Sequence, residues 1–443
     1  TKMPQMQKLY GGGYGFETIT INGNEYLYPD MATDETWGDK YEGQEIVSWY
    51  DLAKWEAGGK VGNPTTSKWQ TPANDIDSFF ETGVVFTNNV SVAQATDRAS
   101  ARISYTNSDL KGYMPNSSLK KNIFNVSAST TSTDKRLELF TNVTYFNSAA
   151  KGRSETGYGD NNVMQKFVQW GHRELDMKEL ISLYRMPDGS QATWNRVAWD
   201  DPSPNYSNNP YWSRYMNYQN DSRNRIYGNV GFSYKIAEFL KFQYKTNLDF
   251  FVDKQYERNA VGSQEQSRYM EMSRQQAELN HEFLLSFNKN ITDFSFSANV
   301  GSNLMNRRYE YVYGETDGGI AFPEFYNLKN SINPPVAYNK LTKKSINSLF
   351  ASGTVGYKSM LYLDLSVRND WSSTLPKGNN SYLYPSVTGS FIFSELLKEQ
   401  LPWMNFGKVR LGFAQVGNDT DPYQIVDTYT HYTNITTTPG YVL

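Results

Sequence analysis

The chain lacks several features that define common protein classes. It contains no cysteine, which excludes disulfide bridges and thiolate chemistry and suits a protein that crosses an oxidising compartment. No apolar run reaches the roughly 18 residues of a transmembrane helix, so a helical membrane span is excluded. The 43 basic and 46 acidic residues nearly balance to a net charge of −3, which argues against nucleic acid as a partner.

Histidine is scarce, and the sequence carries no enzyme motif. The three histidines lie far apart and match no metal-binding spacing: His172, His281 and His431. Gly11, Gly12 and Gly13 are not followed by the Lys-Ser pair of a phosphate-binding loop, and no G-x-S-x-G elbow occurs. We therefore predict that the chain is not an enzyme and name no catalytic residue. A site made of two carboxylates that only the fold brings together stays open as an alternative.

Two acidic clusters have the hard oxygen ligands that Ca²⁺ prefers. They are Asp30, Asp34, Glu35 and Asp39, and then Asn418, Asp419 and Asp421. Neither cluster has the spacing of an EF-hand loop. We expect these residues to cap loops and expect no metal or cofactor, with calcium in the loops as the alternative.

Aromatic residues and a regular alternation are abundant instead. The chain has 33 Tyr, 24 Phe and 10 Trp, or 15% aromatics, as is typical of barrels with aromatic girdles at both membrane boundaries. Apolar and polar residues alternate along Arg225–Ile236 (RIYGNVGFSYKI) and again from Leu240 to Asp253. A period of two predicts long β-strands with one apolar and one polar face. A soluble sandwich would turn the apolar face inward, whereas a membrane barrel would turn it to lipid.

The spacing of the strand-like segments distinguishes these two folds. We predict strands at 81–95, 98–108, 121–132, 135–149, 223–236, 239–255, 274–290, 293–307, 344–358, 360–372, 382–394 and 406–416. Short and long connections alternate between them, as in an antiparallel barrel with tight periplasmic turns and large extracellular loops. The mean hydropathy of −0.65 fits a barrel, because every second residue can be polar. We interpret the chain as an all-β, transmembrane antiparallel outer-membrane β-barrel, of which about twelve strands are present.

The domain organisation follows from this interpretation. Residues 1–80 lack strong alternation, contain a helical stretch near Gln44–Glu56, and are expected to form a structured extracellular excursion at the start of the barrel. Residues 81–443 are expected to form the barrel portion, with long loops at 151–222, 308–343 and 417–443. Because the chain opens abruptly at Thr1, we expect an interior piece of a longer protein.

The longest loop is rich in aromatic residues and contains one helix-like piece, Asp176–Tyr184. These aromatics either form the loop's own small core or serve as stacking platforms for a sugar and anchors for a protein partner. The candidate residues for contact with a substrate or a partner are Trp194, Trp199, Tyr211, Trp212 and Tyr326.

The polar faces of the strands provide a second candidate surface. On three strands, polar residues at every second position are expected to line the lumen: Lys241, Gln243, Lys245, Asn247, Asp249, Glu278, Glu282, Asp364, Arg368 and Asp370. They either form a solvated wall or contact a solute in transit. A wide polar interior is what a porin or a gated transporter needs.

Several stretches resemble one known family, and they occur in that family's order. They are Asp77–Lys120, which contains SFFETGVVFTNNVSVAQATDRASARISYTNSDLKGYMPNSSLK, Pro29–Gly43 (PDMATDETWGDKYEG), Asn208–Trp212 (NNPYW), Asp370–Glu395 (DWSSTLPKGNNSYLYPSVTGSFIFSE) and Lys408–Asp419 (KVRLGFAQVGND). Together they closely resemble the SusC/RagA-type TonB-dependent transporters of Bacteroidota, over essentially the whole chain. They are scaffold motifs and say little about the substrate.

The resemblance implies a 22-stranded barrel of the cell outer membrane with an N-terminal plug. It further implies active import of an oligosaccharide or oligopeptide, a SusD-like lipoprotein lid, contact with lipopolysaccharide, and energy from the TonB–ExbB–ExbD complex. The plug, the TonB box and the last strands are not found in the sequence, so the TonB contact is expected through a part that lies outside it. A passive porin and a surface nutrient-binding barrel remain the alternatives.

Overall fold

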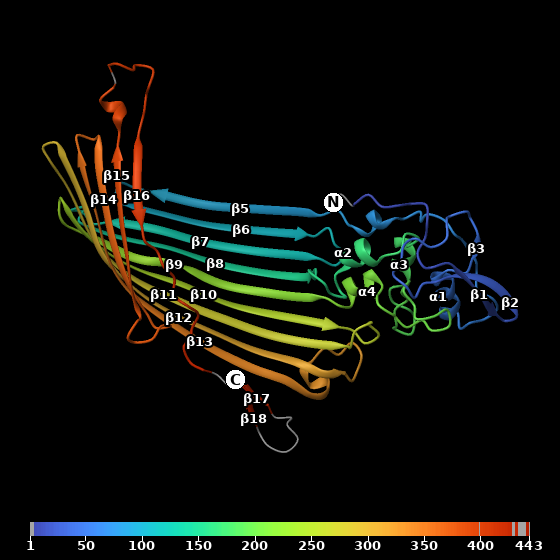
Figure 1. The fold of residues 1–443 in the computed structure, drawn as a ribbon. Coiled ribbons are helices and arrows are strands. Elements are labelled where there is room, and N and C mark those ends of the chain that lie inside the picture. The colour runs from blue at the N-terminus through green and yellow to red at the C-terminus, as the bar shows by residue number, and fades with distance from the viewer. Residues whose placement is uncertain (1–3, 398, 428–429, 433–439, 443) are drawn as a thin grey trace.

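The computed structural model describes residues 4–397, 399–427, 430–432 and 440–442. One large curved β-sheet dominates it, and a smaller mixed unit sits at one end of the strands (Figure 1). In the described residues, no helix has the length and apolar character needed to span a bilayer.

The large sheet contains twelve antiparallel strands, each hydrogen-bonded to its neighbours in the chain. The strands are β5 (Val84–Ala95), β6 (Ala99–Lys111), β7 (Ser118–Thr131), β8 (Leu137–Arg153), β9 (Gln219–Ala237), β10 (Leu240–Asn259), β11 (Arg268–Ile291), β12 (Phe294–Ile320), β13 (Ser331–Tyr357), β14 (Leu361–Ser372), β15 (Ser381–Phe391) and β16 (Val409–Ala414). Strands β5 and β16 form its two edges. All twelve predicted segments overlap these strands, so the prediction of an antiparallel meander is confirmed.

The connections alternate in length, as the spacing predicts. At one end of the sheet, the turn end, the β5–β6, β7–β8, β9–β10, β11–β12 and β13–β14 turns have two to five residues each. Longer connections lie at the opposite end, and the longest of them runs from 154 to 218. The β15–β16 connection at the turn end is the long exception and contains the short helix η4 (Phe393–Glu395).

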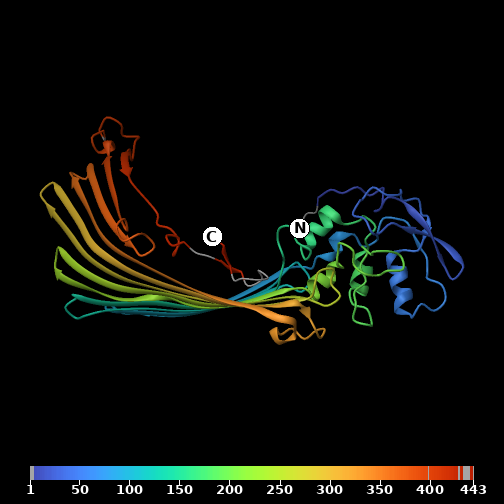
Figure 2. The ribbon, with the colours of Figure 1, turned by 60° about the horizontal axis from the view of Figure 1, so that its bottom comes forward.

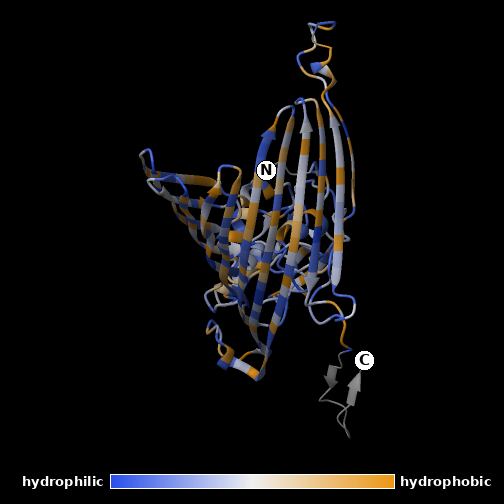
Figure 3. Cartoon of the chain, turned by 90° about the vertical axis from the view of Figure 1, so that its left-hand side faces the viewer, coloured by the Kyte–Doolittle hydropathy of each residue, from blue (hydrophilic) through white to orange (hydrophobic). Residues whose placement is uncertain are grey.

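The apolar side chains of the strands lie on one face of the sheet, the outer face, and remain uncovered. Leu248 and Val367 are each 40% exposed, and Phe232 and Phe242 are partly exposed. Hydrophobic and hydrophilic residues alternate along the strands (Figure 3). The other described sheets have only two strands each and cannot cover this face. The described residues therefore form no sandwich core, and the expectation of a membrane barrel fold is confirmed.

The polar side chains lie on the concave face, here called the inner face. Figure 2 shows the segment that follows β16 crossing the hollow of the curved sheet. Asp419 in that segment accepts hydrogen bonds from Lys344 Nζ at 2.7 Å and from Ser372 Oγ at 2.6 Å. By the β13–β14 register, both donors lie on the same face of the sheet as Ser348 and Asp370. The polar inner face therefore borders the hollow of the curved sheet.

The mixed unit, here called the module, combines residues 4–80 with residues 154–218. Its elements are β1 (Phe16–Ile21), β2 (Asn24–Pro29), β3 (Glu45–Ile46), α1 (Trp49–Ala57), β4 (Ser67–Lys68), η1 (Ile76–Phe79), α2 (Val163–Gln165), η2 (Lys166–Trp170), α3 (Met177–Leu183) and α4 (Pro210–Tyr215). One apolar cluster that includes Trp49, Trp69, Phe79, Phe167 and Leu180 joins the two segments. Burial of so many large side chains supplies the module with a core of its own.

Local capping explains where the helices of the module begin. The predicted helix at Gln44–Glu56 starts only at Trp49, because Ser48 caps it in a capping box with Asp51. Glu45–Ile46 forms strand β3 instead, paired with β4. The predicted helix at Asp176–Tyr184 is confirmed as α3, with Asp176 as its N-cap.

The prediction of a long loop at 308–343 is wrong. Strand β12 continues to Ile320 and β13 starts at Ser331, so only residues 321–330 connect them. The paired register runs through Arg308↔Lys343 and Tyr313↔Tyr338, with irregularities after Glu315. Cross-strand aromatic packing, with the rings of Tyr313 and Tyr338 4.8 Å apart, extends the hairpin past the point where the apolar alternation ends. Within the predicted loop 417–443, Thr430–Tyr432 (β17) pairs with Gly440–Val442 (β18), and 428–429, 433–439 and 443 lie outside the described residues.

Candidate functional site

The residues predicted to line the lumen all occupy the inner face. On β10 and β11, Lys245 Nζ lies 2.9 Å from Glu282, and Asn247 Nδ2 donates to the same carboxylate at 2.7 Å. Asp249 accepts a hydrogen bond from Arg225 Nε at 2.7 Å. These charge-assisted bonds bridge neighbouring strands and hold the side chains against the wall.

The remaining predicted lumen residues form similar local bonds. Lys241 Nζ lies 3.7 Å from Glu138, and Glu278 accepts from Asn280 at 3.1 Å. On β14, Arg368 Nε donates to Asp370 at 2.7 Å, and Asp364 accepts from Thr354 at 2.6 Å. Gln243 shares the face of Lys241 and Lys245 on β10. The β14 group stands three strands away from β11, so the structure places the predicted residues in two separate groups.

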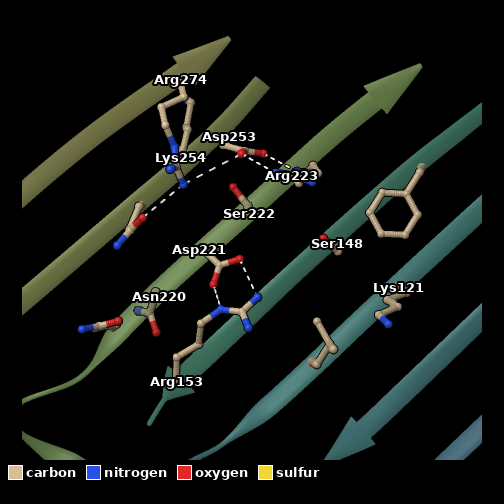
Figure 4. A pocket seen from close by; sticks show the side chains of 14 residues that line it. Lys121, Ser148, Arg153, Asn220, Asp221, Ser222, Arg223, Asp253, Lys254 and Arg274 are labelled. Atoms are coloured by element: carbon tan, nitrogen blue, oxygen red, sulfur yellow. Dashed lines mark hydrogen bonds and ion pairs between the residues drawn. The ribbon is translucent and has the colours of Figure 1, made fainter. Parts of the chain in front are cut away.

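A pocket on the inner face, near the module end of the strands, was missed by the sequence prediction. It encloses about 600 Å³ and draws its lining from β7, β8, β9, β10 and β11. Figure 4 shows the ion pairs in it, which join Arg153 to Asp221 and both Arg223 and Arg274 to Asp253. Asp249 and Arg225 lie on the same face, further toward the turn end. The spacing of Arg223 and Arg225 in the sequence places both side chains on one face of a strand and could have indicated the pocket. The bulge that adds Arg153 to the same face has no comparable signal in the sequence.

The aromatic residues predicted to contact a partner lie mainly inside the module. Trp194 is 2% exposed and its ring lies 4.6 Å from that of His172. Tyr211 is 3% exposed and packs against Phe79, and Trp212 is 1% exposed. These three side chains are unavailable for direct contact in this structure, which corrects the expectation. Trp194 and Tyr211 form part of the core of the module, as the alternative interpretation predicts, whereas Trp212 packs against Met216 and against Ala260 of the β10–β11 connection.

The other two candidate aromatics are only partly buried. Trp199 packs against the core of the module. Tyr326, in the β12–β13 connection, lies beneath the guanidinium of Arg258, which is 4.4 Å from the ring centre. Ion pairing of the neighbouring Glu324 with Arg185 joins this connection to the module. Because Tyr326 also packs against the cluster that contains Trp212, it helps to hold the module against the ends of the strands.

The acidic clusters do not gather into a metal site. In the described residues, no group of three or more His, Asp or Glu side chains has an arrangement that would hold an ion. Asp419 bonds to Lys344 and Ser372, and Asp30 accepts a hydrogen bond from the backbone of Ala32 at 3.0 Å. The hydrogen bonds of Asp30 and Asp419 therefore stabilise the conformation of loops.

A buried ion pair joins the two segments of the module. His172 Nδ1 lies 2.9 Å from Glu174, and the other carboxylate oxygen accepts from the Gly12 backbone at 2.8 Å. Burial lowers the pKa of His172, but the charge of Glu174 and its hydrogen bond outweigh burial and raise that pKa above its ordinary value. Burial alone would raise the pKa of Glu174, yet His172 holds it below its ordinary value. Each member of the pair therefore favours the charged form of the other.

Comparison with known proteins places this geometry in a structural class. No protein-family model matches the chain, and no curated protein matches it. Among solved structures, the RagAB peptide importer in its 'open-open' state matches with a TM-score of 0.66 and 14% identity, over 84% of this chain and 41% of the other. The 'closed-closed' state matches with a TM-score of 0.64, again at 14% identity, over 84% of this chain and 42% of the other.

The chain therefore shares the fold of part of the RagAB structures. A second RagAB structure, described as a peptide transporter, agrees with a TM-score of 0.65 at 13% identity, over 84% of this chain and 42% of the other. The chain thus spans about two fifths of the length of the solved structures it resembles. Those structures are described as transporters or importers and not as enzymes.

Proposed function

We propose that this chain forms part of the wall of an outer-membrane importer that uses TonB to take up a large nutrient. The observation that carries the proposal is the two-faced sheet. Its outer face presents uncovered apolar side chains, and its inner face is lined largely by polar side chains such as Lys245, Asn247 and Glu282. A wall of this kind suits a water-filled conduit in lipid. The likeness to the RagAB peptide importer supports import over a purely structural role.

The module is the part of the chain that we assign to the extracellular side. The short turns gather at the opposite end of the sheet, as periplasmic turns do in outer-membrane barrels. The surface of the module exposes large aromatic side chains, including Tyr158 at 82%, Trp37 at 69% and Tyr206 at 56%. Exposed aromatics are typical anchors in protein interfaces. We assign to this surface the contact with a SusD-like lipoprotein lid, with an oligopeptide or oligosaccharide as the cargo.

Uptake measurements distinguish the importer from a passive porin. Cells that carry the full-length gene should accumulate the nutrient, and a protonophore or deletion of tonB should abolish the accumulation. A deletion of the transporter gene is the matched control. Uptake that continues unchanged without a proton gradient would contradict the proposal and identify a diffusion channel.

A further inference from the structure

The pocket on the inner face has a charge opposite to that of the whole chain. Five cationic residues line it, of which Lys254 alternates with the inner-face residues of β10 and the other four lie on the inner face: Lys121, Arg153, Arg223 and Arg274. Only two carboxylates, Asp221 and Asp253, oppose them, although the chain as a whole carries a net charge of −3. The excess of positive charge is therefore local to this part of the wall.

A backbone irregularity brings one of these cations to the inner face. The register between β8 and β9 shifts between Lys151 and Arg153, and Gly152 adopts a φ of 64° there. Such a bulge turns the next side chain to the other face of the sheet. Arg153 consequently joins Asp221 on the inner face, and its Nη2 donates to Asp221 at 2.9 Å. A Cβ atom at position 152 would lie 1.9 Å from the Asn116 carbonyl oxygen, so this geometry requires glycine.

The carboxylates hold two of the arginines in fixed positions. Arg223 makes a bidentate pair with Asp253, with both nitrogen–oxygen distances at 2.6 Å. Its guanidinium also lies 4.8 Å from the ring centre of Phe251. Asp253 is 7% exposed, so this pair forms a rigid floor for the pocket. Fixed donors lose little entropy when a ligand binds.

The other two cations keep unused donor capacity. Lys121 has no hydrogen-bond or ion-pair partner in the described part of the chain. Arg274 donates to Gln255 at 3.3 Å and lies 4.0 Å from Asp253, but its Nε is buried without a partner among the described residues. A buried N–H without an acceptor costs free energy, which a bound acceptor would recover. Both side chains therefore point to a ligand that carries negative charge.

We infer that this pocket is a binding subsite for a carboxylate group of the transported nutrient. The inference rests on the proposed importer function and narrows its cargo to acidic molecules, either acidic peptides or oligosaccharides that contain uronic acid. Guanidinium groups recognise carboxylates through paired hydrogen bonds, and Lys121 adds a mobile charge. A neutral glycan would leave these donors unpaired.

Calorimetric titration of the purified full-length transporter tests the subsite directly. The probes are triglutamate and triglutamine, and trigalacturonate and neutral galactotriose. We expect at least one acidic probe to bind about tenfold more tightly than its neutral partner, in line with one unscreened charge contact, and to weaken as salt is added. The acidic probe that binds identifies the source of the carboxylate. Equal affinity for the acidic and neutral members of both pairs would overturn the inference.

The variants leave the Arg153–Asp221 and Arg223–Asp253 ion pairs intact. Lys121→Glu and Arg274→Gln should each weaken binding of the acidic probe about tenfold, because they remove a cation that no carboxylate strongly pairs. Lys235→Gln is the matched control: it lies on β9, on the same face as Arg223 and about 40 Å away along the strand. Unchanged affinity in both pocket variants would refute the subsite. Binding needs no proton gradient, so the subsite and the importer function can fail independently.

Discussion

Replacement of Leu248 by arginine would place a charge on the outer face, near the middle of the apolar band. On β10 this face presents Leu240, Phe242, Tyr244, Thr246, Leu248, Phe250 and Val252, and then the charged Lys254. The apolar stretch covers about 40 Å of strand at about 3.3 Å per residue, or about 28 Å of depth at a tilt of about 45°. That depth matches the hydrocarbon core of a bilayer.

The expected destabilisation follows from the depth of Leu248. This residue lies two positions from the middle of the stretch, and its side chain is 40% exposed on the outer face. Arginine on the lipid face costs about 2–4 kcal/mol at the midplane and about 0–1 kcal/mol near the interfaces. We therefore expect Leu248→Arg to lower the free energy of unfolding by about 2 kcal/mol.

Denaturant unfolding of the full-length transporter in lipid vesicles measures this difference. The matched control is Asn247→Arg, because Asn247 lies on the inner face and donates to Glu282 at 2.7 Å. Arginine there keeps an acidic partner and contacts water, so a change within about 0.5 kcal/mol is expected. If Asn247→Arg were the destabilised variant and Leu248→Arg behaved like the unmodified protein, the two faces would be assigned the wrong way round.

Two further predictions concern the module. Trp212→Ala should destabilise the packing of the 154–218 segment by about 3–5 kcal/mol, because it empties a buried site and removes the 2.8 Å hydrogen bond to Ser263. Limited proteolysis should then cut this segment faster, whereas the exposed control Tyr158→Ala should be cut as before; equal rates would count against a packed core. For His172, the raised pKa means that the charged pair stabilises fully below the ordinary histidine value of about 6.5, and that the stabilisation is lost as pH rises through the raised value. Hydrogen exchange at the Gly12 amide should therefore accelerate beyond its intrinsic pH dependence, and His172→Gln should remove the excess; an excess that persists in the variant would exclude this pair as its cause.

The strands could be predicted because their signal is local and repeats. Outer-face residues such as Leu248 and Leu365 share the same exposed environment. The alternation of apolar and polar residues alone therefore predicts where a strand lies, which face each side chain occupies and about how long the strand is. The ends of strands β12 and β13 were placed wrongly, because Tyr309, Tyr311 and Tyr338 pair outside the apolar band, where side chains on both faces are polar or aromatic. In that region the sequence does not alternate between apolar and polar residues, so cross-strand packing determines where the strands end.

The candidate sites were less predictable, because they depend on contacts between distant residues. Trp194 and Trp212 are residues of the type that forms binding platforms, but both are buried. Trp194 packs against a segment more than a hundred residues earlier in the chain, and Trp212 packs against the β10–β11 connection. The pocket needs the bulge at Gly152 to bring Arg153 beside Asp221. A single glycine in a strand indicates a bulge in general but does not say which side chain it turns.

The module imposes an order on assembly. Gly12 contacts Glu174, Met31 accepts from Asn195, and Glu56 pairs with Arg196, so its interior forms between positions about 140 to 164 residues apart. Four strands, β5 to β8, separate the two halves in the chain. Contacts of such long range form late. The first half must therefore wait until the 154–218 segment has reached the same end of the sheet, and the completed module then joins the chain before β5 to the chain before β9.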